Sequence, residues 1–462
     1  MAFAFLVKAT ILKIKVYKKV NINEILTKER IEFVREKRKE IRDATFVGVK
    51  EKIGADAARE LENLYSLFDE KIYIWLARLW DREAGAFYYS ESARDTSPYL
   101  PDIESTVQAL RFLNNSGMIR PGEGNYINRI PTAIRDGIVN FALSLQDEDG
   151  FFYHPQWGKD ISPSRRGRDL SWAKNTLAEA GVEPKYMLPT AKTSDGKSSA
   201  HLPDYLKSLD AFKKYLDEMD LATNSYYYGN VIESTMSLIS AAGEEYTSCL
   251  AGWLNSKNRA DNGLWEEGIR YSSVNGLMKM SGNYPALKVG LPHPVASLKS
   301  TIYAAMSDEP MSFVCEVYNP WATIGNIFRA NRDCPEKEEL DRLRCELIDS
   351  ASELIAKTAK KIEVFRKTDG SYSYFKKMSS AVSQRAPVAV PRTNEGDVNA
   401  TTICVGSTTR CMRAALGLPM IPIFAPEDGD LFFELLENAP KTEKTRHLDA
   451  FPEKPSYEEE TA

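Results

Sequence analysis

The chain alternates stretches in which apolar residues recur at helical spacing with longer polar segments rich in glycine and aromatic residues. Apolar residues at every third or fourth position form one face of an amphipathic helix. We therefore predict about a dozen helices, at 57–80, 102–115, 130–146, 168–181, 201–218, 230–242, 245–257, 293–306, 317–331, 336–360, 399–416 and 429–438. No segment shows the regular alternation typical of strands, so the pattern predicts an all-α protein.

Two short units recur along this pattern. One is a glycine followed by aromatic residues, at 85–89, 149–153, 262–265 and 369–372. The other is a polar, cap-like start of a helix, at 102–106, 230–235 and 397–402, with a weaker copy at 293–301. Polar residues there would cap the free N–H groups of a first helical turn. The loops at 82–101, 147–167, 258–292 and 367–397 exceed the length of ordinary connectors, which indicates a functional role.

Helices that alternate with long loops favour helical hairpins closed into a ring. The expected fold is an (α/α)6 toroid of about twelve helices over residues 55–438, with long Gly/aromatic loops at one rim. Its inner helices would begin with the capping units, so that their N-termini converge on one mouth. The pattern resembles the α/α-toroid superfold, whose branches include terpenoid cyclases with protein prenyltransferases, and six-hairpin glycosidases with polysaccharide lyases. A fold alone does not fix the function.

The terpenoid branch of this resemblance implies particular acids. Class II cyclases open an inner helix with Asp-x-Asp-Asp, and the best matching segment here, 397–401, lacks both later acids. The copy at 102–105 keeps two acids without the adjacent third, and no zinc set of the prenyltransferase kind is present. Because these acids are missing, the terpenoid branch is the weaker one, and a terpenoid-cyclase-like enzyme is kept as an alternative.

Both ends of the chain differ from this central region. Residues 1–54 are predicted to be an extension with a charged helix outside the ring, and residues 439–462 a polar, disordered tail. The first apolar stretch is too short for a signal peptide, and no other stretch reaches the length of a membrane span. We expect a cytoplasmic protein that does not bind a membrane.

Composition excludes several classes of partner. With 60 basic and 65 acidic residues the formal net charge is −5, which argues against nucleic acid as a partner. The six cysteines are scattered and there are only four histidines, so neither a disulfide framework nor a metal site is expected. No glycine-rich phosphate loop precedes a helix, so no cofactor is expected.

The acids at the predicted inner-helix starts are the candidates for catalysis. Glycoside hydrolysis ordinarily uses two carboxyl groups, one as acid and one as base or nucleophile. Residues that face each other across one mouth could form such a pair, and we predict this role for Asp102, Glu104, Glu233 and Asp397. Each acid taken singly could instead be a helix cap that the helix dipole favours.

Aromatic and basic residues in the long loops are the candidates for substrate binding. Aromatic faces pack on sugar rings, and arginine pairs with carboxylates or sulfates. The predicted binding residues are His154, Trp157, Arg165, Arg166, Arg168, Trp265, Tyr284 and His293. We therefore expect an enzyme that cleaves a glycosidic linkage in an oligosaccharide, with hydrolysis ahead of β-elimination. A non-catalytic oligosaccharide-binding or scaffold protein is the third alternative.

Overall fold

The computed structural model describes residues 22–191 and 202–452. The N-terminal extension predicted before residue 22, the start of the helix predicted at 201–218 and the last ten residues of the predicted tail lie outside the described residues. Helix accounts for 60% of the structure and strand for 4%, in about 14 helices with shorter helical turns. The prediction of a mostly α-helical protein is confirmed at this level.

The longer helices define the architecture. They are α2 (Lys28–Ser66), α3 (Lys71–Arg78), α5 (Ile103–Ser116), α6 (Thr132–Ser144), α7 (Pro163–Ala180), α8 (Leu209–Asp217), α9 (Leu221–Ala242), α10 (Glu244–Lys257), α11 (Tyr271–Ser281), α13 (Pro294–Met306), α14 (Cys315–Ala330), α15 (Lys337–Asp349), α16 (Ala351–Glu363), α18 (Thr408–Ala415) and α19 (Pro426–Glu437). Shorter helical pieces are α1 (Ile22–Ile25), α4 (Glu91–Asp95), α12 (Tyr284–Leu287), α17 (Val398–Thr402), the 3-10 turns η1 (Tyr126–Arg129) and η2 (Asp204–Leu206), and the π-helical turn η3 (Ile403–Ser407).

The strands of the described chain are all two residues long. β1 (Trp80–Asp81) pairs antiparallel with β2 (Ala86–Phe87), and β4 (Val382–Ser383) with β5 (Ala386–Pro387). β3 (Thr96–Ser97) pairs in parallel with β6 (Arg446–His447). This last pair holds part of the predicted disordered tail, residues 439–452, against the body of the protein.

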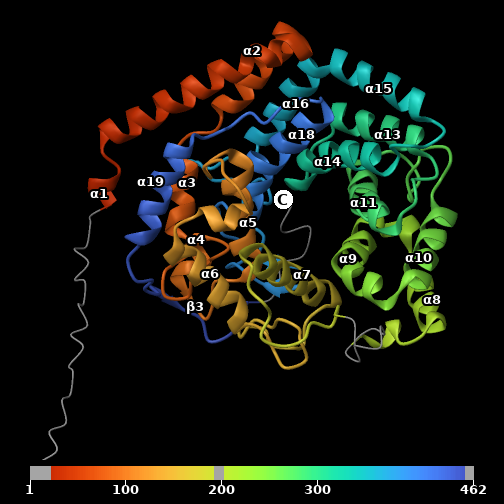
Figure 1. Cartoon of the computed structure of the whole chain (residues 1–462), viewed down its shortest axis with the longest axis horizontal. Helices are drawn as coiled ribbons and strands as arrows, with labels where there is room; N and C mark the ends of the chain where they lie inside the picture. Colours follow the sequence, from red (N-terminus) through yellow and green to blue (C-terminus); the bar gives the residue numbers. More distant parts are fainter. Residues whose placement is uncertain (1–21, 192–201, 453–462) are drawn as a thin grey trace, which may run out of the picture.

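One set of helices is joined by successive side-by-side contacts. α5 contacts α7, α7 contacts α9, α9 contacts α11 and α11 contacts α14. α14 in turn contacts α18 and η3, and η3 contacts α5. A second set packs outside them: α8 and α10 lie at the periphery beyond α9, and α2 runs along one edge of the molecule over α16 (Figure 1).

Several helix starts follow the predicted capping chemistry. The Asp102 carboxylate accepts the Ser105 N–H at the start of α5, and the Asp397 carboxylate accepts the Ala400 N–H at the start of α17. The unit at 230–235 does not begin a helix, because α9 already starts at Leu221 with Asp220 as its cap. Glu233 therefore lies within a helix and not at its N-terminus.

The glycine–aromatic units are tight turns that pack against neighbouring helices. All four glycines have positive φ, from 68° at Gly263 to 90° at Gly370, a conformation that glycine adopts without strain. A Cβ on Gly263 would lie 2.3 Å from the Ser297 backbone nitrogen, at α13. The aromatic residues that follow are buried in the core, at Phe87, Phe152, Trp265 and Tyr372. The repeat is thus explained by packing.

Other boundaries differ from the prediction for physical reasons. The segment 258–292, predicted as one loop, contains α11, which is buried on most of its residues and therefore lacks the polar face that marks an amphipathic helix. α7 begins at Pro163, five residues before the predicted start, with Ser162 as its cap and proline in the first turn. The helix predicted at 57–80 is broken between Ser66 and Lys71, and that at 336–360 at Ser350.

The charged N-terminal helix is attached to the body through buried ion pairs. α2 is interrupted at Gly54, whose φ is 80°, at the predicted boundary between the extension and the central region. N-terminal to this kink, Arg38 is buried and pairs with Glu70 at 3.0 Å and with Asp428 at 3.1 Å. These contacts join α2 to the start of α3 and to α19.

Candidate functional site

A cavity of about 1200 Å3 lies among the helices that contact one another in succession. Its wall includes residues from α5, α7, α9, α11, α14, α17 and η3, together with the hairpin formed by β4 and β5. The volume exceeds the roughly 300–1,000 Å3 of a pocket for one small ligand. The cavity is therefore large enough for an extended molecule such as an oligosaccharide.

The cavity wall combines amides, hydroxyls, aromatic rings and a few charges. Amides come from Gln108, Asn175, Asn224, Asn230, Asn275, Asn319, Gln384 and Asn399. Aromatic rings come from Tyr89, Trp172, Tyr215, Tyr226, Tyr227, Tyr228, Phe313, Tyr318, Tyr374 and Phe375. The charged residues are Arg111, Arg168, Glu218, Glu233, Lys279 and Arg385. A wall of this kind offers both hydrogen bonds and flat apolar faces.

Glu233 is the predicted catalytic acid that lines this cavity. It projects from the middle of α9, and its side chain is 39% exposed to the cavity. Lys279 on α11 donates to its carboxylate at 2.7 Å. Burial alone would raise the pKa of Glu233, but Lys279 and Arg168 outweigh it and lower that pKa. Glu233 is consequently ionised at neutral pH.

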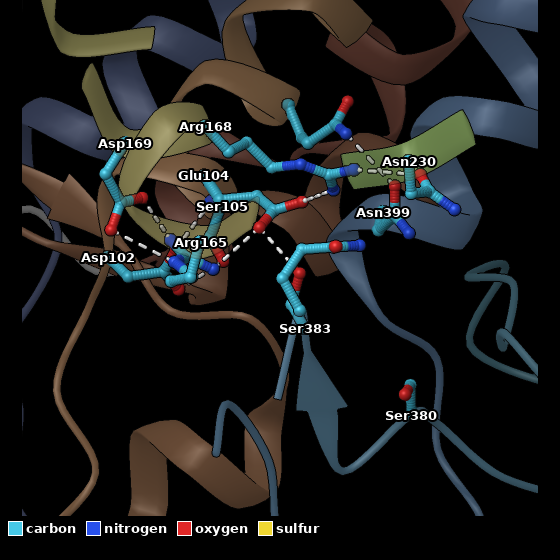
Figure 2. A network of polar contacts seen from close by, with 12 residues as sticks. Asp102, Glu104, Ser105, Arg165, Arg168, Asp169, Asn230, Ser380, Ser383 and Asn399 are labelled. Atoms are coloured by element: carbon cyan, nitrogen blue, oxygen red, sulfur yellow. Dashed lines mark hydrogen bonds and ion pairs between the residues drawn. The ribbon is translucent and has the colours of Figure 1, made fainter. Parts of the chain in front are cut away.

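Glu104 and Asp102 occupy a different environment, a dry network of ion pairs behind the cavity wall. Glu104 is 1% exposed and lies between two arginines: Arg165 donates to it at 2.7 Å and Arg168 at 2.9 Å (Figure 2). Ser383 of β4 donates a third hydrogen bond at 2.6 Å. Burial alone would raise the pKa of Glu104, but the two arginines and Ser383 outweigh it and lower that pKa.

Arg165 is the centre of this network. It is fully buried, and it donates to Asp169, one turn further along α7, through Nε at 3.0 Å as well as to Glu104. Asp102 lies 3.6 Å from the Arg165 guanidinium, and burial raises the pKa of Asp102. Burial also raises the pKa of Asp169 to about 6, against the opposing effect of Arg165. We call Asp102, Glu104, Arg165 and Asp169 the inner network.

Arg168 links the inner network to the cavity. Its guanidinium bonds Glu104 on one side and reaches Asn230 of α9 at 3.4 Å, and Figure 2 shows it extending from the network toward Asn230. Arg168 and Arg111 both lie over the ring of Trp172, each 5.5 Å from its centroid. Within the wall, Gln108 donates to Asn399 at 3.0 Å.

Asp397 lies one layer behind the cavity wall. Its carboxylate is fully buried and accepts N–H groups from Ala400 and Tyr374, both at 2.8 Å. Burial raises the pKa of Asp397 to about 7, although a hydrogen bond from the Tyr89 side chain lowers it. Tyr89 and Tyr374 themselves line the cavity. Asp397 is therefore separated from the cavity by Tyr89 and Tyr374, which contact its carboxylate.

Three predicted binding residues of the segment 149–173 lie away from the described cavity wall. His154 is buried, lies 2.8 Å from the Pro101 carbonyl and stacks on Trp157, and burial lowers its pKa to about 4. Trp157 in turn lies 4.9 Å from the Arg165 guanidinium. Arg166 lies over Phe151 at 5.8 Å. These side chains support the inner network and the loop that precedes α7.

The other predicted binding residues also lie outside the described wall. Trp265 is a core residue that donates a hydrogen bond to the Leu254 carbonyl. Tyr284 is buried, and its hydroxyl donates to the Asn255 side-chain oxygen at 2.7 Å. His293 occupies the N-cap position of α13 without making a capping bond. Of the eight predicted binding residues, Arg168 alone is among the described residues that line the cavity.

Several cavity residues were missed at the sequence level. Lys279 and Asn275 lie on α11, which was assigned to a loop, and Tyr226 and Asn230 lie in the part of α9 around its predicted start. Arg111 and Trp172 lie on predicted helices, but their role depends on which face turns inward. A helix with polar residues among small and apolar ones on its buried face, as in α11, is the signal that could have found them.

The described residues contain no group of three or more His, Cys, Asp and Glu that could hold a metal ion. Their six cysteines are free thiols. In the same part of the chain, none of the helices is long and apolar enough to cross a membrane.

Comparison with known proteins adds no family to this geometry: the chain matches no protein-family model, no curated protein and no solved structure.

Proposed function

We propose that this protein cleaves a glycosidic linkage in an oligosaccharide that binds in the cavity. The observation that carries the proposal is the composition of the wall: Asn and Gln amides, tyrosine and serine hydroxyls and aromatic rings surround an ionised carboxylate, Glu233. Sugars present hydroxyls for the amides and flat C–H faces for the rings. An apolar tunnel suited to isoprenoids would lack the eight amides that the described residues bring to this wall.

The proposed fold behind this function is the (α/α)6 toroid. Its support is the succession of helix contacts from α5 through α7, α9, α11 and α14 to α18 and η3, and from η3 back to α5. Apart from α18, each of these elements contributes residues to the cavity wall, and Tyr215 of α8 reaches it as well. In the proposed ring they are the inner helices, and α6, α8, α10, α13 and α16 belong to the outer layer.

The proposed chemistry uses Glu233 and Tyr89. Glu233, held ionised by Lys279, acts as base or nucleophile, and the Tyr89 hydroxyl donates a proton to the leaving oxygen. Asp397, whose pKa of about 7 lies near neutral pH, replaces that proton through its hydrogen bond to Tyr89. Asp397 is thus a positioning residue. In this proposal Asp102 and Glu104 hold Arg165 and Arg168 in place and do not touch the substrate.

Turnover of oligosaccharides by a Glu233→Gln variant tests the proposal. The purified protein is incubated with neutral and uronate-containing oligosaccharides, and the products are separated by chromatography. Removing the base lowers turnover by about 10²–10⁴ while saccharide binding is retained. A Glu346→Gln variant on the outer helix α15 is the matched control and keeps full activity.

The products also distinguish the routes of cleavage. Hydrolysis adds water across the linkage, whereas β-elimination leaves an unsaturated uronate that absorbs in the ultraviolet. Binding without cleavage of any oligosaccharide would favour the binding or scaffold alternative. Binding of isoprenoid diphosphates in place of saccharides would overturn the proposal in favour of a terpenoid-cyclase-like enzyme.

A further inference from the structure

Arg111 differs from the other cations that lie near Glu233 in the cavity. Three cations act on Glu233: Lys279, Arg168 and Arg111 each lower its pKa, against the effect of burial. Lys279 is paired with Glu233 itself at 2.7 Å, and Arg168 with Glu104 at 2.9 Å. Among the described residues, Arg111 is the one of these three cations that makes no ion pair.

Arg111 is built into the wall without a carboxylate of its own. It lies on α5, is exposed in the cavity and, within the described residues, has its guanidinium over the ring of Trp172 and in no ion pair. Stacking on tryptophan orients the planar guanidinium and leaves its N–H groups available. Such a group is suited to bind a carboxylate or sulfate through two parallel hydrogen bonds.

A second cation for which the described part of the chain offers no ion pair lies in the hairpin at the cavity. Arg385, between β4 and β5, donates to the Tyr227 hydroxyl at 2.8 Å and lies over its ring. Gln384 and Arg385 have φ of 49° and 72°, a conformation that non-glycine residues rarely adopt. Strained backbone of this kind concentrates at functional sites. The wall therefore carries two uncompensated cations, Arg111 and Arg385, against one remaining acid, Glu218.

We propose that the cavity selects saccharides that carry an anionic substituent, a carboxylate or a sulfate, and that Arg111, oriented by Trp172, binds this substituent. The inference rests on the proposed function and names its substrate class. Because Arg168 and Lys279 are already paired, the anion is bound chiefly by Arg111, with Arg385 adding to the positive field.

Calorimetric titration with three matched ligands tests this selection. The ligands are an oligogalacturonide, its carboxyl-reduced neutral counterpart and a sulfated counterpart of the same length. The unmodified protein binds at least one anionic ligand more tightly than the neutral one by about tenfold to a hundredfold, the range of a charge-assisted hydrogen-bond pair. The difference between the carboxylate and the sulfate ligands identifies the substituent.

Substitutions at Arg111 assign the effect. Arg111→Gln abolishes the preference and leaves the affinity for the neutral ligand unchanged, whereas Arg111→Lys retains part of it. Arg135→Gln, on the outer helix α6, is the control and keeps the full preference. Circular dichroism of each variant establishes that it is folded.

The remaining outcomes separate this inference from the proposed function. Equal affinity for neutral and anionic ligands, or an equal loss of both in Arg111→Gln, overturns the selection by charge while the cleavage proposal stands. Failure of all three saccharides to bind also overturns the selection by charge, and the turnover assay with Glu233→Gln decides the cleavage proposal separately.

Discussion

The inner network and the group formed by Glu233, Lys279 and Arg111 both consist of carboxylates and basic side chains. The first group is buried and the second lines the cavity. In the inner network, Arg165 and Glu104 are almost completely removed from solvent and fully paired. Glu233 is 39% exposed, pairs with Lys279, and lies near Arg111, which makes no ion pair within residues 22–191 and 202–452. We call Glu233, Lys279 and Arg111 the cavity cluster.

The difference shows what burial does to identical charges. A buried ion pair cannot lose one member without leaving a charge in a medium that does not solvate it. An exposed pair loses little when one member is removed, because water replaces the partner. The inner network is therefore suited to fixing the geometry of α5 and α7, and the cavity cluster to exchanging protons and ligands. Three predictions follow from this comparison, and they differ in the size of their expected effects.

The largest effect is expected at Arg165. Arg165→Met leaves the carboxylates of Glu104, Asp102 and Asp169 without their shared cation, which lowers the free energy of unfolding by about 3–5 kcal/mol. Urea denaturation measures the change. The control is Arg342→Met, which removes exposed ion pairs on α15 and leaves stability unchanged. Equal losses in both variants would contradict the role assigned to the inner network.

A smaller, pH-dependent effect is expected at His154, which supports the inner network through Trp157. Burial lowers its pKa to about 4, from an ordinary value of 6.5. Between pH 6.5 and 4 the unfolded chain therefore binds a proton at His154 and the folded chain does not. The contribution of His154 to the free energy of unfolding is consequently lost as the pH decreases across that window. The contribution lost amounts to about 3 kcal/mol at most.

Urea denaturation of the unmodified protein and of a His154→Gln variant from pH 7 to 4 isolates the contribution of His154 to the free energy of unfolding. The gap in unfolding free energy between the two proteins moves in favour of the variant as the pH falls. Acids with raised pKa, such as Asp169 and Asp397, cancel in the difference because both proteins contain them. A gap that is constant with pH would show that His154 titrates normally.

The smallest effect on stability is expected in the cavity cluster. Glu233→Gln breaks the pair with Lys279, but the side chain is solvated, so the free energy of unfolding changes by less than about 1 kcal/mol. The same denaturation assay measures it. A loss as large as that of Arg165→Met would mean that the two clusters play the same structural role and would remove the basis of the comparison.

The sequence predicted the helices best where periodicity or capping is local. α5, α6, α10 and α13 begin and end within two residues of their predicted bounds, and Asp102 and Asp397 cap helices as expected. α11 was missed because its burial on nearly all sides is a property of the packed molecule and leaves no alternation in the sequence. The start of α9 was misplaced because Asp220 and Asn230 carry similar capping signals.

The sequence predicted which kinds of side chain the candidate site contains better than it predicted which individual positions supply them. Glu233 and Arg168 line the cavity, but Trp265 and Tyr284 are core residues whose aromatic character reflects packing. Nothing local distinguishes Arg165, which is buried, from Arg168, which reaches the cavity three residues later. That distinction is made by α5 and α9, which contact α7 from distant parts of the sequence.

The hydrogen bond from Ser383 to Glu104 joins residues 279 positions apart, and that from Gln108 to Asn399 spans 291. Contacts this distant form slowly, because a long loop must close before they contribute. During synthesis the first two thirds of the chain emerge with α5 and α7 unable to complete their wall, since α17 and η3 have not yet been made. Assembly of the cavity wall is consequently a late event, and truncation before residue 383 leaves Glu104 without Ser383, Gln108 without Asn399, and the cavity without the wall that η3 supplies.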